Sequence, residues 1–492
     1  MSGQTIADQK IAELARAEKS KLKKVMGFRD LVLFYIACIV TMRVVALSTE
    51  NGPSVVVLWV LGFALFYVPQ ALTVVELTSR HPDEGGIYIW AKRAFGDFHG
   101  FITAWFYWAT NLVYFPAVLL FSASNAAFVV PGWSYLAEDP RFLATFSLAG
   151  IVLVVVVNVL GLDIAKRLHN ASGYLNMWVP GLIVMVLGFL AWLNFGAASE
   201  FSPSTVTPSF GGLSDVILLA AVAYGFTGLE SASIMSEEVQ DPRRNVPRAL
   251  ATAGLMMLAM FIFISSAMLV VLPVDQVSGL TGLTDTARVA GTKLIGTTVG
   301  GLLGSIVALC LCIAAIGTVS AWMATCARLP FVAGLDRYLP PAFGTLHPKY
   351  ATPHVSIITL GVATAALIVL GNMGGTAQQI YRVFISLEIV VYFIPFIYMF
   401  GALLVMQRHP AADDIQRAPF APYGAYFAGG AGLVVTVASF VFALIPGELV
   451  EDKTFFYVTV FGMLGVLTLI GVGIYANGRL RRRRIEAAPN PV

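Results

Sequence analysis

The sequence predicts an all-α integral membrane protein with twelve transmembrane helices, and three observations carry that prediction. The 492 residues are 58% hydrophobic and only 12% charged, whereas about a quarter of the residues in soluble domains are charged. Twelve stretches are apolar and long enough to cross a bilayer, and the basic residues gather in alternate connecting segments. This composition excludes a disordered chain and disfavours a nucleic-acid-binding protein.

The twelve stretches meet the length that a bilayer requires. A spanning helix needs about 20 apolar residues to cross about 30 Å of hydrocarbon. The stretches are 29–48, 53–77, 100–130, 143–161, 173–194, 213–236, 249–272, 294–328, 354–371, 381–406, 426–446 and 455–477. The third and eighth are longer than necessary, so we expect them to tilt or to extend beyond the bilayer. The first 25 residues lack the apolar core of a signal peptide, so the first span should begin the fold.

The basic residues predict which side of the membrane each connection faces. With the N-terminus inside, 25 of the 31 Lys and Arg residues fall in cytoplasmic segments and 5 fall outside, while Arg43 lies within a span. This bias follows the positive-inside rule and would invert in the reverse topology. We therefore expect a multi-pass protein of the cell (inner or plasma) membrane with both termini in the cytoplasm. The arginine run 481–484 is expected to be a topogenic anchor, with anionic lipid binding as the alternative.

Motifs of several other protein classes are absent from the sequence. No Gly-Lys dipeptide occurs, so there is no Walker A loop, and there is no His-Glu-x-x-His zinc motif. A Thr-Val-Gly-Tyr-Gly selectivity filter is also absent. The four cysteines lie inside apolar segments without metal-ligand spacing. We therefore expect no enzymatic activity, no ATP-driven transport by this chain alone, no metal site, no cofactor and no nucleic-acid partner.

Four charged residues fall at membrane depth. They are Arg43 in the first span, Glu76 near the inner end of the second, Glu230 in the sixth and Glu388 in the tenth. A charge at mid-span costs about 2.5–3.5 kcal/mol on insertion scales, so each side chain should face the bundle interior or a cavity. We favour a substrate site or gate for Arg43 and Glu230. A functional role and a structural ion pair are equally supported for Glu388, and Glu76 is expected to be structural.

The sixth span contains a segment that favours a break in the helix. Residues 224–230 read Tyr-Gly-Phe-Thr-Gly-Leu-Glu, with two glycines and a threonine within seven positions. Unwound backbone at mid-membrane is tolerated where it lines a cavity, and its free N–H and C=O groups suit a zwitterion. The alternative is close helix packing through small residues.

Four further motifs accompany this segment. They are Gln240-Asp-Pro-Arg-Arg-Asn-Val-Pro247; Glu76-Leu-Thr-Ser-Arg-His-Pro82 with Gly85-Gly86-Ile-Tyr88 and Ala94-Phe-Gly96; Ala327-Arg328-Leu-Pro with Gly334-Leu-Asp336-Arg-Tyr-Leu-Pro340; and Pro348-Lys-Tyr-Ala-Thr352-Pro353. Together with the Gly-Phe-Thr-Gly-x-Glu segment they resemble the amino acid–polyamine–organocation superfamily of secondary transporters over residues 30 to 400. The stretch 84–100 is similar to the branches that hold glutamate/γ-aminobutyrate antiporters and plant polyamine carriers.

This resemblance implies a core of two inverted five-helix repeats with two peripheral helices. The chain would then divide into a cytoplasmic segment 1–28, a first repeat 29–194, a second repeat 213–406, a peripheral pair 426–477 and a cytoplasmic basic tail 478–492. The partners would be the lipid bilayer and a small-molecule substrate, an amino acid or a related amine, held between broken first and sixth spans.

The candidate site residues follow from the same resemblance and from the charges at membrane depth. The expected substrate-binding residues are Thr41, Met42, Arg43, Tyr224, Gly225, Phe226, Thr227 and Gly228. The expected gate or coupling residues are Tyr224, which falls where relatives place an aromatic gate, together with Glu230 and Glu388. Asn111, in the aromatic third span, is a further candidate for the cavity.

Two departures from the family pattern leave alternatives open. Relatives break the first span with a Gly-Ser-Gly-Ile-Phe type motif, whereas residues 39–45 read Ile-Val-Thr-Met-Arg-Val-Val, without glycine. Arg43 either clamps a substrate carboxylate bidentately or pairs with Glu230 or Glu388. The fifth span also lacks the lysine that several proton-coupled relatives carry, as do the exchangers of the family.

We therefore favour an amino acid exchanger that works by alternating access. The alternatives are a proton-coupled symporter that uses a carboxylate, sodium coupling through hydroxyls such as Thr318 and Ser320, and a polyamine or amine carrier. Arg43 at the site argues against a cationic ligand. A receptor or scaffold that does not transport is disfavoured, because it needs neither a broken helix nor charges at membrane depth.

Overall fold

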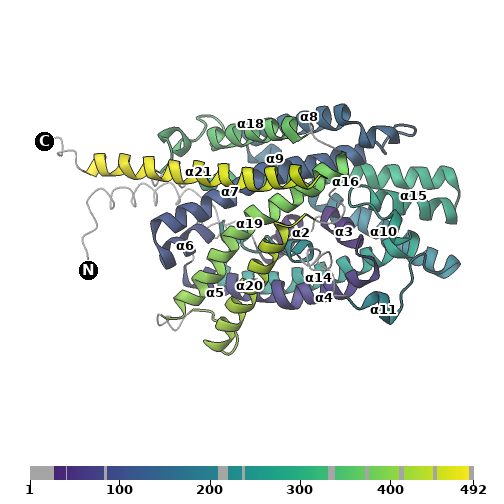
Figure 1. The fold of residues 1–492 in the computed structure, drawn as a ribbon, viewed down its shortest axis with the longest axis horizontal. Helices are drawn as coiled ribbons and strands as arrows, with labels where there is room; N and C mark the ends of the chain where they lie inside the picture. Colours follow the sequence, from purple (N-terminus) through teal and green to yellow (C-terminus); the bar gives the residue numbers. More distant parts are fainter. Residues whose placement is uncertain are drawn as a thin grey trace.

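The computed structural model describes residues 27–39, 42–81, 86–208, 220–234, 239–330, 338–371, 376–408, 415–446 and 452–486. Every regular element in these ranges is a helix (Figure 1). The candidate Thr41 lies outside the described residues, as do residues 1–26 and the motif residues 82–85 and 331–337.

The helices form one bundle in which most members run along a common direction (Figure 1). In chain order the elements are α2 (Phe28–Ile39), α3 (Met42–Thr49), η1 (Gly52–Ser54), α4 (Val55–Gly62), η2 (Phe63–Tyr67), α5 (Val68–Arg80), α6 (Ile87–Phe95), α7 (Asp97–Ala126), η3 (Ser134–Glu138), α8 (Pro140–Leu160), α9 (Leu162–Gly173), η4 (Tyr174–Trp178), α10 (Val179–Phe195), α11 (Pro203–Val206), α13 (Ser231–Ile234), α14 (Pro242–Val271), η6 (Val274–Gln276), α15 (Gly282–Leu294), α16 (Thr297–Cys326), η7 (Pro341–Gly344), α18 (His354–Gly371), α19 (Ala377–Met406), α20 (Tyr423–Ala443) and α21 (Lys453–Glu486). The C-terminal end of α21 projects beyond the neighbouring helices, at the left of Figure 1.

Ten helical stretches among the described residues are long and apolar enough to cross a membrane. They are 52–80, 97–126, 140–160, 171–195, 242–271, 297–330, 354–371, 379–406, 423–443 and 453–480. Each overlaps one of the twelve predicted spans. The two remaining predicted spans, 29–48 and 213–236, include residues outside the described ranges, and the resemblance predicts both to be broken. The total of twelve and the inverted repeats stay predictions.

The helix α7 lies at the centre of the bundle. Its most apolar 18-residue window is entirely buried, whereas the corresponding window of α21 is only 22% buried. Such an all-round burial means that neighbouring helices, rather than lipid, surround α7. Side chains on every face of α7 therefore point at protein, and those near its middle can line an internal site.

Two of the spans contain a π-helical turn. These turns are η2 (Phe63–Tyr67) and η4 (Tyr174–Trp178), and each is followed two residues later by a proline, Pro69 and Pro180. Proline has no N–H group to continue the helical hydrogen-bond ladder, and an inserted residue relieves the clash of its ring with the preceding turn. The proline positions thus explain the local geometry of the second and fifth spans.

Glu76 joins the C-terminal end of the second predicted span to the end of the tenth. One carboxylate oxygen accepts hydrogen bonds from Arg80 at 2.8 Å and from Gln407 Nε2 at 2.6 Å. The other oxygen accepts from the backbone N–H of Ala418 at 2.9 Å. Glu76 is fully buried, so this network ties α5 to the segment between α19 and α20. The contacts fit the structural role expected for Glu76.

His169 lies in α9, just before the fifth span, and is largely buried against α16. Its Nε2 lies 2.9 Å from the Ser320 hydroxyl, which accepts a hydrogen bond from Asn158 Nδ2 at 2.8 Å. Burial lowers the pKa of His169 to about 4, below the value of about 6.5 expected in an unfolded chain. The folded protein therefore holds His169 neutral. The stability that this supplies is complete above pH 6.5 and is lost as the pH falls from 6.5 towards 4.

We expect this group to lower the free energy of unfolding by about 2 kcal/mol between pH 7.5 and pH 5. A His169→Gln variant should lack that part of the pH dependence, because glutamine does not titrate. Thermal unfolding of both proteins in detergent at the two pH values measures the difference. Identical pH dependence in the two proteins would contradict the prediction.

Candidate functional site

The sixth predicted span is interrupted in the described structure. Its helix ends at Tyr224, residues 225–230 are not helical, and the short helix α13 begins at Ser231. Beyond Tyr224 the backbone bonds shorten to three-residue turns, from Phe226 N–H to Ala223 and from Thr227 N–H to Tyr224. Gly228 adopts φ +109°, in the region that favours glycine. The interruption thus lies on the residues that the sequence singles out.

The Gly228 conformation makes a testable prediction for stability. We expect Gly228→Ala to lower the free energy of unfolding by about 1–3 kcal/mol, because a residue with a Cβ is strained at this φ. A matched control is Gly462→Ala on α21, where an added Cβ meets no atom within 4 Å and should be neutral or slightly stabilising. Thermal unfolding in detergent compares the two variants, and equal shifts would argue against the prediction.

In the first predicted span the structure describes α2 up to Ile39 and α3 from Met42 onward. Met42 and Arg43 are buried, with 1% and 2% exposure. The Arg43 guanidinium forms a bidentate ion pair with Glu388 of α19, in which Nη1 and Nη2 donate to the two carboxylate oxygens at 3.2 and 3.0 Å. Of the two alternatives for Arg43, the described structure contains the glutamate pair.

The hydroxyl of Tyr224 joins this ion pair by donating a hydrogen bond to Glu388. The carboxylate of Glu388 is fully buried, so its partners in the described structure are the guanidinium and the phenol. The guanidinium carbon of Arg43 also lies 5.1 Å from the centre of the Tyr114 ring on α7, within the range of a cation–π contact. The first, third, sixth and tenth spans therefore meet at this buried pair.

A second ion pair joins the end of α3 to α19. In this pair the acidic residue, Glu50, follows α3 and the basic residue, Arg382, lies on α19. Arg382 donates to Glu50 at 2.8 Å, and the same carboxylate accepts from the backbone N–H of Gly279 at 2.7 Å. Burial raises the pKa of Glu50, while Arg382 acts to lower it. Because both acidic groups on this face have a basic partner, α3 and α19 are held together without net charge.

Glu230 is held differently, by neutral donors. Its fully buried carboxylate accepts hydrogen bonds from Gln70 Nε2 at 3.0 Å, Tyr107 at 2.9 Å and Tyr392 at 2.6 Å. Among the described residues, no Lys, Arg or His nitrogen lies within 4 Å of it. Three converging donors match an ionised carboxylate, which only accepts hydrogen bonds. In its ionised form, Glu230 therefore has hydrogen-bond donors but no basic partner among the described residues.

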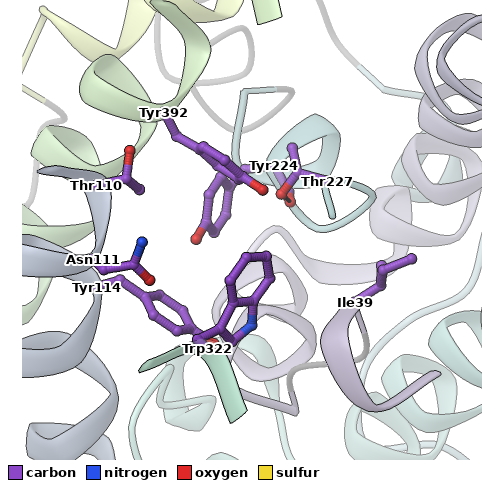
Figure 2. Close-up of a pocket in the computed structure, with 8 residues that line it drawn as sticks. All are labelled: Ile39, Thr110, Asn111, Tyr114, Tyr224, Thr227, Trp322 and Tyr392. Atoms are coloured by element: carbon purple, nitrogen blue, oxygen red, sulfur yellow. Dashed lines mark hydrogen bonds between the residues drawn. The ribbon is translucent and has the colours of Figure 1, made fainter. Parts of the chain in front are cut away.

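A cavity lies beside these groups, at the interruption of the sixth span (Figure 2). Its walls come from five helical regions and consist of Ile39, Thr110, Asn111, Tyr114, Tyr224, Thr227, Trp322 and Tyr392. In Figure 2 the rings of Tyr224 and Tyr392 face those of Tyr114 and Trp322 across the open space. About 30 Å³ of the space beside these side chains admits the centre of a water molecule. The free volume of the cavity is therefore small.

Several predicted site residues do not line this cavity. The ring of Phe226 packs between Trp59 and Phe261, with ring centres 5.6 and 5.5 Å apart. Gly225 lies against Trp59 and Val44, where a Cβ would come within 3.1 and 3.0 Å of their side chains. Both residues therefore serve packing in this structure. Met42 and Arg43 line a second, smaller cavity on the far side of Tyr114.

Sequence reasoning missed most of the cavity walls. Thr110, Asn111 and Tyr114 recur at helical spacing on one face of α7, and Asn111 alone was a candidate. The indole N–H of Trp322 is buried and has no partner among the described residues, so it offers a donor to a bound molecule. The one signal for the three residues of α7 is a polar and aromatic stripe on a helix that is buried on all faces.

The arrangement suits a small organic molecule. Four aromatic rings offer faces that attract an ammonium group. Thr110, Asn111 and Thr227 donate to backbone carbonyls, so they offer their hydroxyl and amide oxygens as acceptors. In the part of the chain that the structure describes, no group of three His, Cys, Asp or Glu side chains is placed to hold a metal ion.

Comparisons with known proteins agree with this description. The family model described as amino acid permease matches residues 27–467. An uncharacterized transporter of Legionella pneumophila is 25% identical over 449 residues, covering 91% of this chain and 95% of the relative. A probable agmatine/putrescine antiporter, AguD, of Lactococcus lactis is 20% identical over 421 residues, covering 84% of this chain and 87% of the relative.

Proposed function

Because the chain belongs to the amino acid permease family and is a multi-pass membrane transporter, we propose that it exchanges amino acids or related amines by alternating access. The substrate would occupy the cavity beside the interrupted sixth span. The observation that carries this proposal is the coincidence of that cavity with the non-helical residues 225–230, because non-helical backbone at membrane depth is tolerated where it lines a cavity.

Two features support exchange rather than ion coupling. The fifth span contains no lysine, and one relative is by its name a probable antiporter of agmatine and putrescine. Sodium coupling would need free hydroxyls on α16. The hydroxyl of Thr318 lies 3.3 Å from the hydroxyl of Ser172, and the hydroxyl of Ser320 contacts Asn158 and His169. Both hydroxyls on α16 are therefore already engaged. Proton coupling through Glu230 is the second candidate, since that carboxylate lacks a basic partner among the described residues.

The surroundings of the transporter complete the proposal. The distribution of Lys and Arg supports an orientation in the cell membrane with both termini in the cytoplasm. The resemblance supports two inverted five-helix repeats, 29–194 and 213–406, with the peripheral pair 426–477.

Counterflow in proteoliposomes tests the proposal. Vesicles are preloaded with common amino acids, γ-aminobutyrate, agmatine or putrescine, and labelled uptake is followed with and without proton and sodium gradients. Uptake that needs an internal substrate and ignores both gradients is the expected result. Uptake into empty vesicles that requires a gradient would make the chain a symporter instead, and absence of uptake with every compound would refute the transport proposal.

The location of the site is tested by a pair of tryptophan variants. We expect Trp322→Leu to lower counterflow about tenfold, because an aromatic contact with the substrate is worth about 1.4 kcal/mol. The matched control is Trp192→Leu on α10, where the side chain is 54% exposed on the outer surface and counterflow should be unchanged. Equal effects at both positions would place the substrate elsewhere.

A further inference from the structure

The charges beside the cavity do not cancel. Arg43 and Glu388 form a bidentate pair, and Glu50 and Arg382 form a second pair near the end of α3. Glu230 has hydrogen-bond donors but no basic partner among the described residues. The described groups around the cavity therefore sum to one negative charge, located at the interrupted sixth span.

A tyrosine side chain separates each of the carboxylates of Glu388 and Glu230 from the cavity. Tyr224 donates to Glu388 and Tyr392 donates to Glu230, and both tyrosine rings line the cavity wall. Tyr114 similarly separates the cavity from the Arg43 guanidinium. A substrate is thus one side chain away from each charged group. At that range, in a medium of intermediate dielectric constant, a charge still contributes strongly to binding.

An anionic group would find no free counter-ion here. Both terminal nitrogens of Arg43 are engaged by Glu388. Its Nε is buried without a partner among the described residues, but Arg43 does not line this cavity, and the Tyr114 ring lies between the guanidinium and the cavity. An organic cation, in contrast, would compensate Glu230 and contact the faces of four aromatic rings. A buried carboxylate without a counter-ion is costly, so a cation also relieves a cost that the empty site carries.

We propose that Glu388 determines the charge class of the substrate: by neutralising Arg43 it leaves Glu230 uncompensated, so that the cavity selects organic cations over neutral and anionic molecules. This inference rests on the proposed exchange function and names its substrate class as cationic amino acids or amines. It also removes the objection that Arg43 opposes a cationic ligand, because the guanidinium is already paired. Glu388 acts through Arg43 and Tyr224, so it is a positioning residue rather than a substrate contact.

The wild-type protein supplies the first test, with competitors of different charge, of which arginine and citrulline have nearly the same shape. Arginine carries one net positive charge, citrulline is its neutral isostere, and agmatine is arginine without the carboxylate; glutamate supplies the anionic case. We expect arginine or agmatine to compete in counterflow at least about tenfold better than citrulline, and glutamate not to compete. Equal competition by arginine and citrulline would overturn the inference while leaving the exchange function intact. Absence of counterflow with every compound would refute both.

Variants of the ion pair supply the second test. Glu388→Gln exposes the charge of Arg43, so the ratio of arginine to citrulline competition should fall by at least about tenfold. The double variant Arg43→Met/Glu388→Gln restores neutrality and should keep the wild-type ratio. Glu76→Gln, which removes a buried carboxylate from a different network, is the control and should also keep it.

The double variant keeps the test decisive if Glu388→Gln does not fold. A double variant that transports but has lost the preference for cations would overturn the assignment, because it has the same net charge as the wild type. The same conclusion would follow if Glu388→Gln and the double variant had one and the same charge preference. A shifted ratio in the single variant with a restored ratio in the double variant is the result that the assignment requires.

Discussion

Replacing Arg43 by methionine is expected to lower the free energy of unfolding by about 3–5 kcal/mol, because it leaves the Glu388 carboxylate buried without a counter-ion. Glu388 is fully buried and Arg43 is 2% exposed, so water cannot replace the lost partner. Thermal unfolding in detergent, with the yield of monodisperse protein, measures the effect.

The double variant Arg43→Met/Glu388→Gln should recover most of this loss, since a neutral pair of similar volume carries no uncompensated charge. A second control is Arg288→Met, which breaks the Arg288–Asp285 ion pair whose side chains are 50% and 19% exposed. That change should cost less than about 1 kcal/mol. If Arg43→Met cost no more than Arg288→Met, the buried pair would not have the role assigned to it.

Glu230→Gln is expected to have the second largest effect, about 2–3 kcal/mol of stability and most of the counterflow activity. The change replaces a charged acceptor, whose hydrogen bonds are worth about 1.5–3 kcal/mol each, by an amide that brings an N–H group among three donors. The substrate cation would also lose its compensating charge, which lowers counterflow about a hundredfold if the loss reaches about 2.7 kcal/mol.

Tyr107→Phe provides the matched comparison, because it removes one donor to Glu230 and leaves the charge in place. Its cost should be near 1 kcal/mol, and its charge preference in counterflow should remain that of the wild type, since Tyr107 is not among the residues that line the cavity. Thermal unfolding and counterflow are measured on both variants, so that the loss of the charge is compared with the loss of one hydrogen bond. If the Glu230→Gln protein were as stable and as active as the Tyr107→Phe protein, the charge of Glu230 would have no role in stability or substrate binding beyond that of one hydrogen bond.

The main features of the fold follow from local signals in the sequence. The ten long helices are apolar stretches of spanning length, and each overlaps a predicted span because the bilayer fixes that length. The interruption at 225–230 follows from the glycines at 225 and 228, one of which adopts a conformation that favours glycine. Membership of the permease family likewise follows from motifs that can be read directly.

The composition of the site depends on long-range geometry and was predicted less well. Arg43 and Glu388 lie 345 residues apart, so the sequence presents both charges without deciding whether Arg43 pairs with Glu388, with Glu230 or with a substrate. Phe226 and Gly225 were placed in the substrate site because they adjoin the interruption, yet the turn directs them towards Trp59. Trp322 lies on a helix with many buried side chains, and no local pattern separates the cavity wall from ordinary packing.

The two carboxylate networks also bear on the kinetics of the carrier. Tyr224 and Glu230 flank the interruption, and each is hydrogen-bonded to α19. Any movement of the sixth segment relative to α19 must break bonds to buried carboxylates, each worth about 1.5–3 kcal/mol, before water reaches them. The barrier to reorientation is therefore largely enthalpic, so turnover should rise steeply with temperature. In the proposed exchange cycle, a bound substrate that takes over some of these bonds would lower the barrier, and the empty carrier would return slowly.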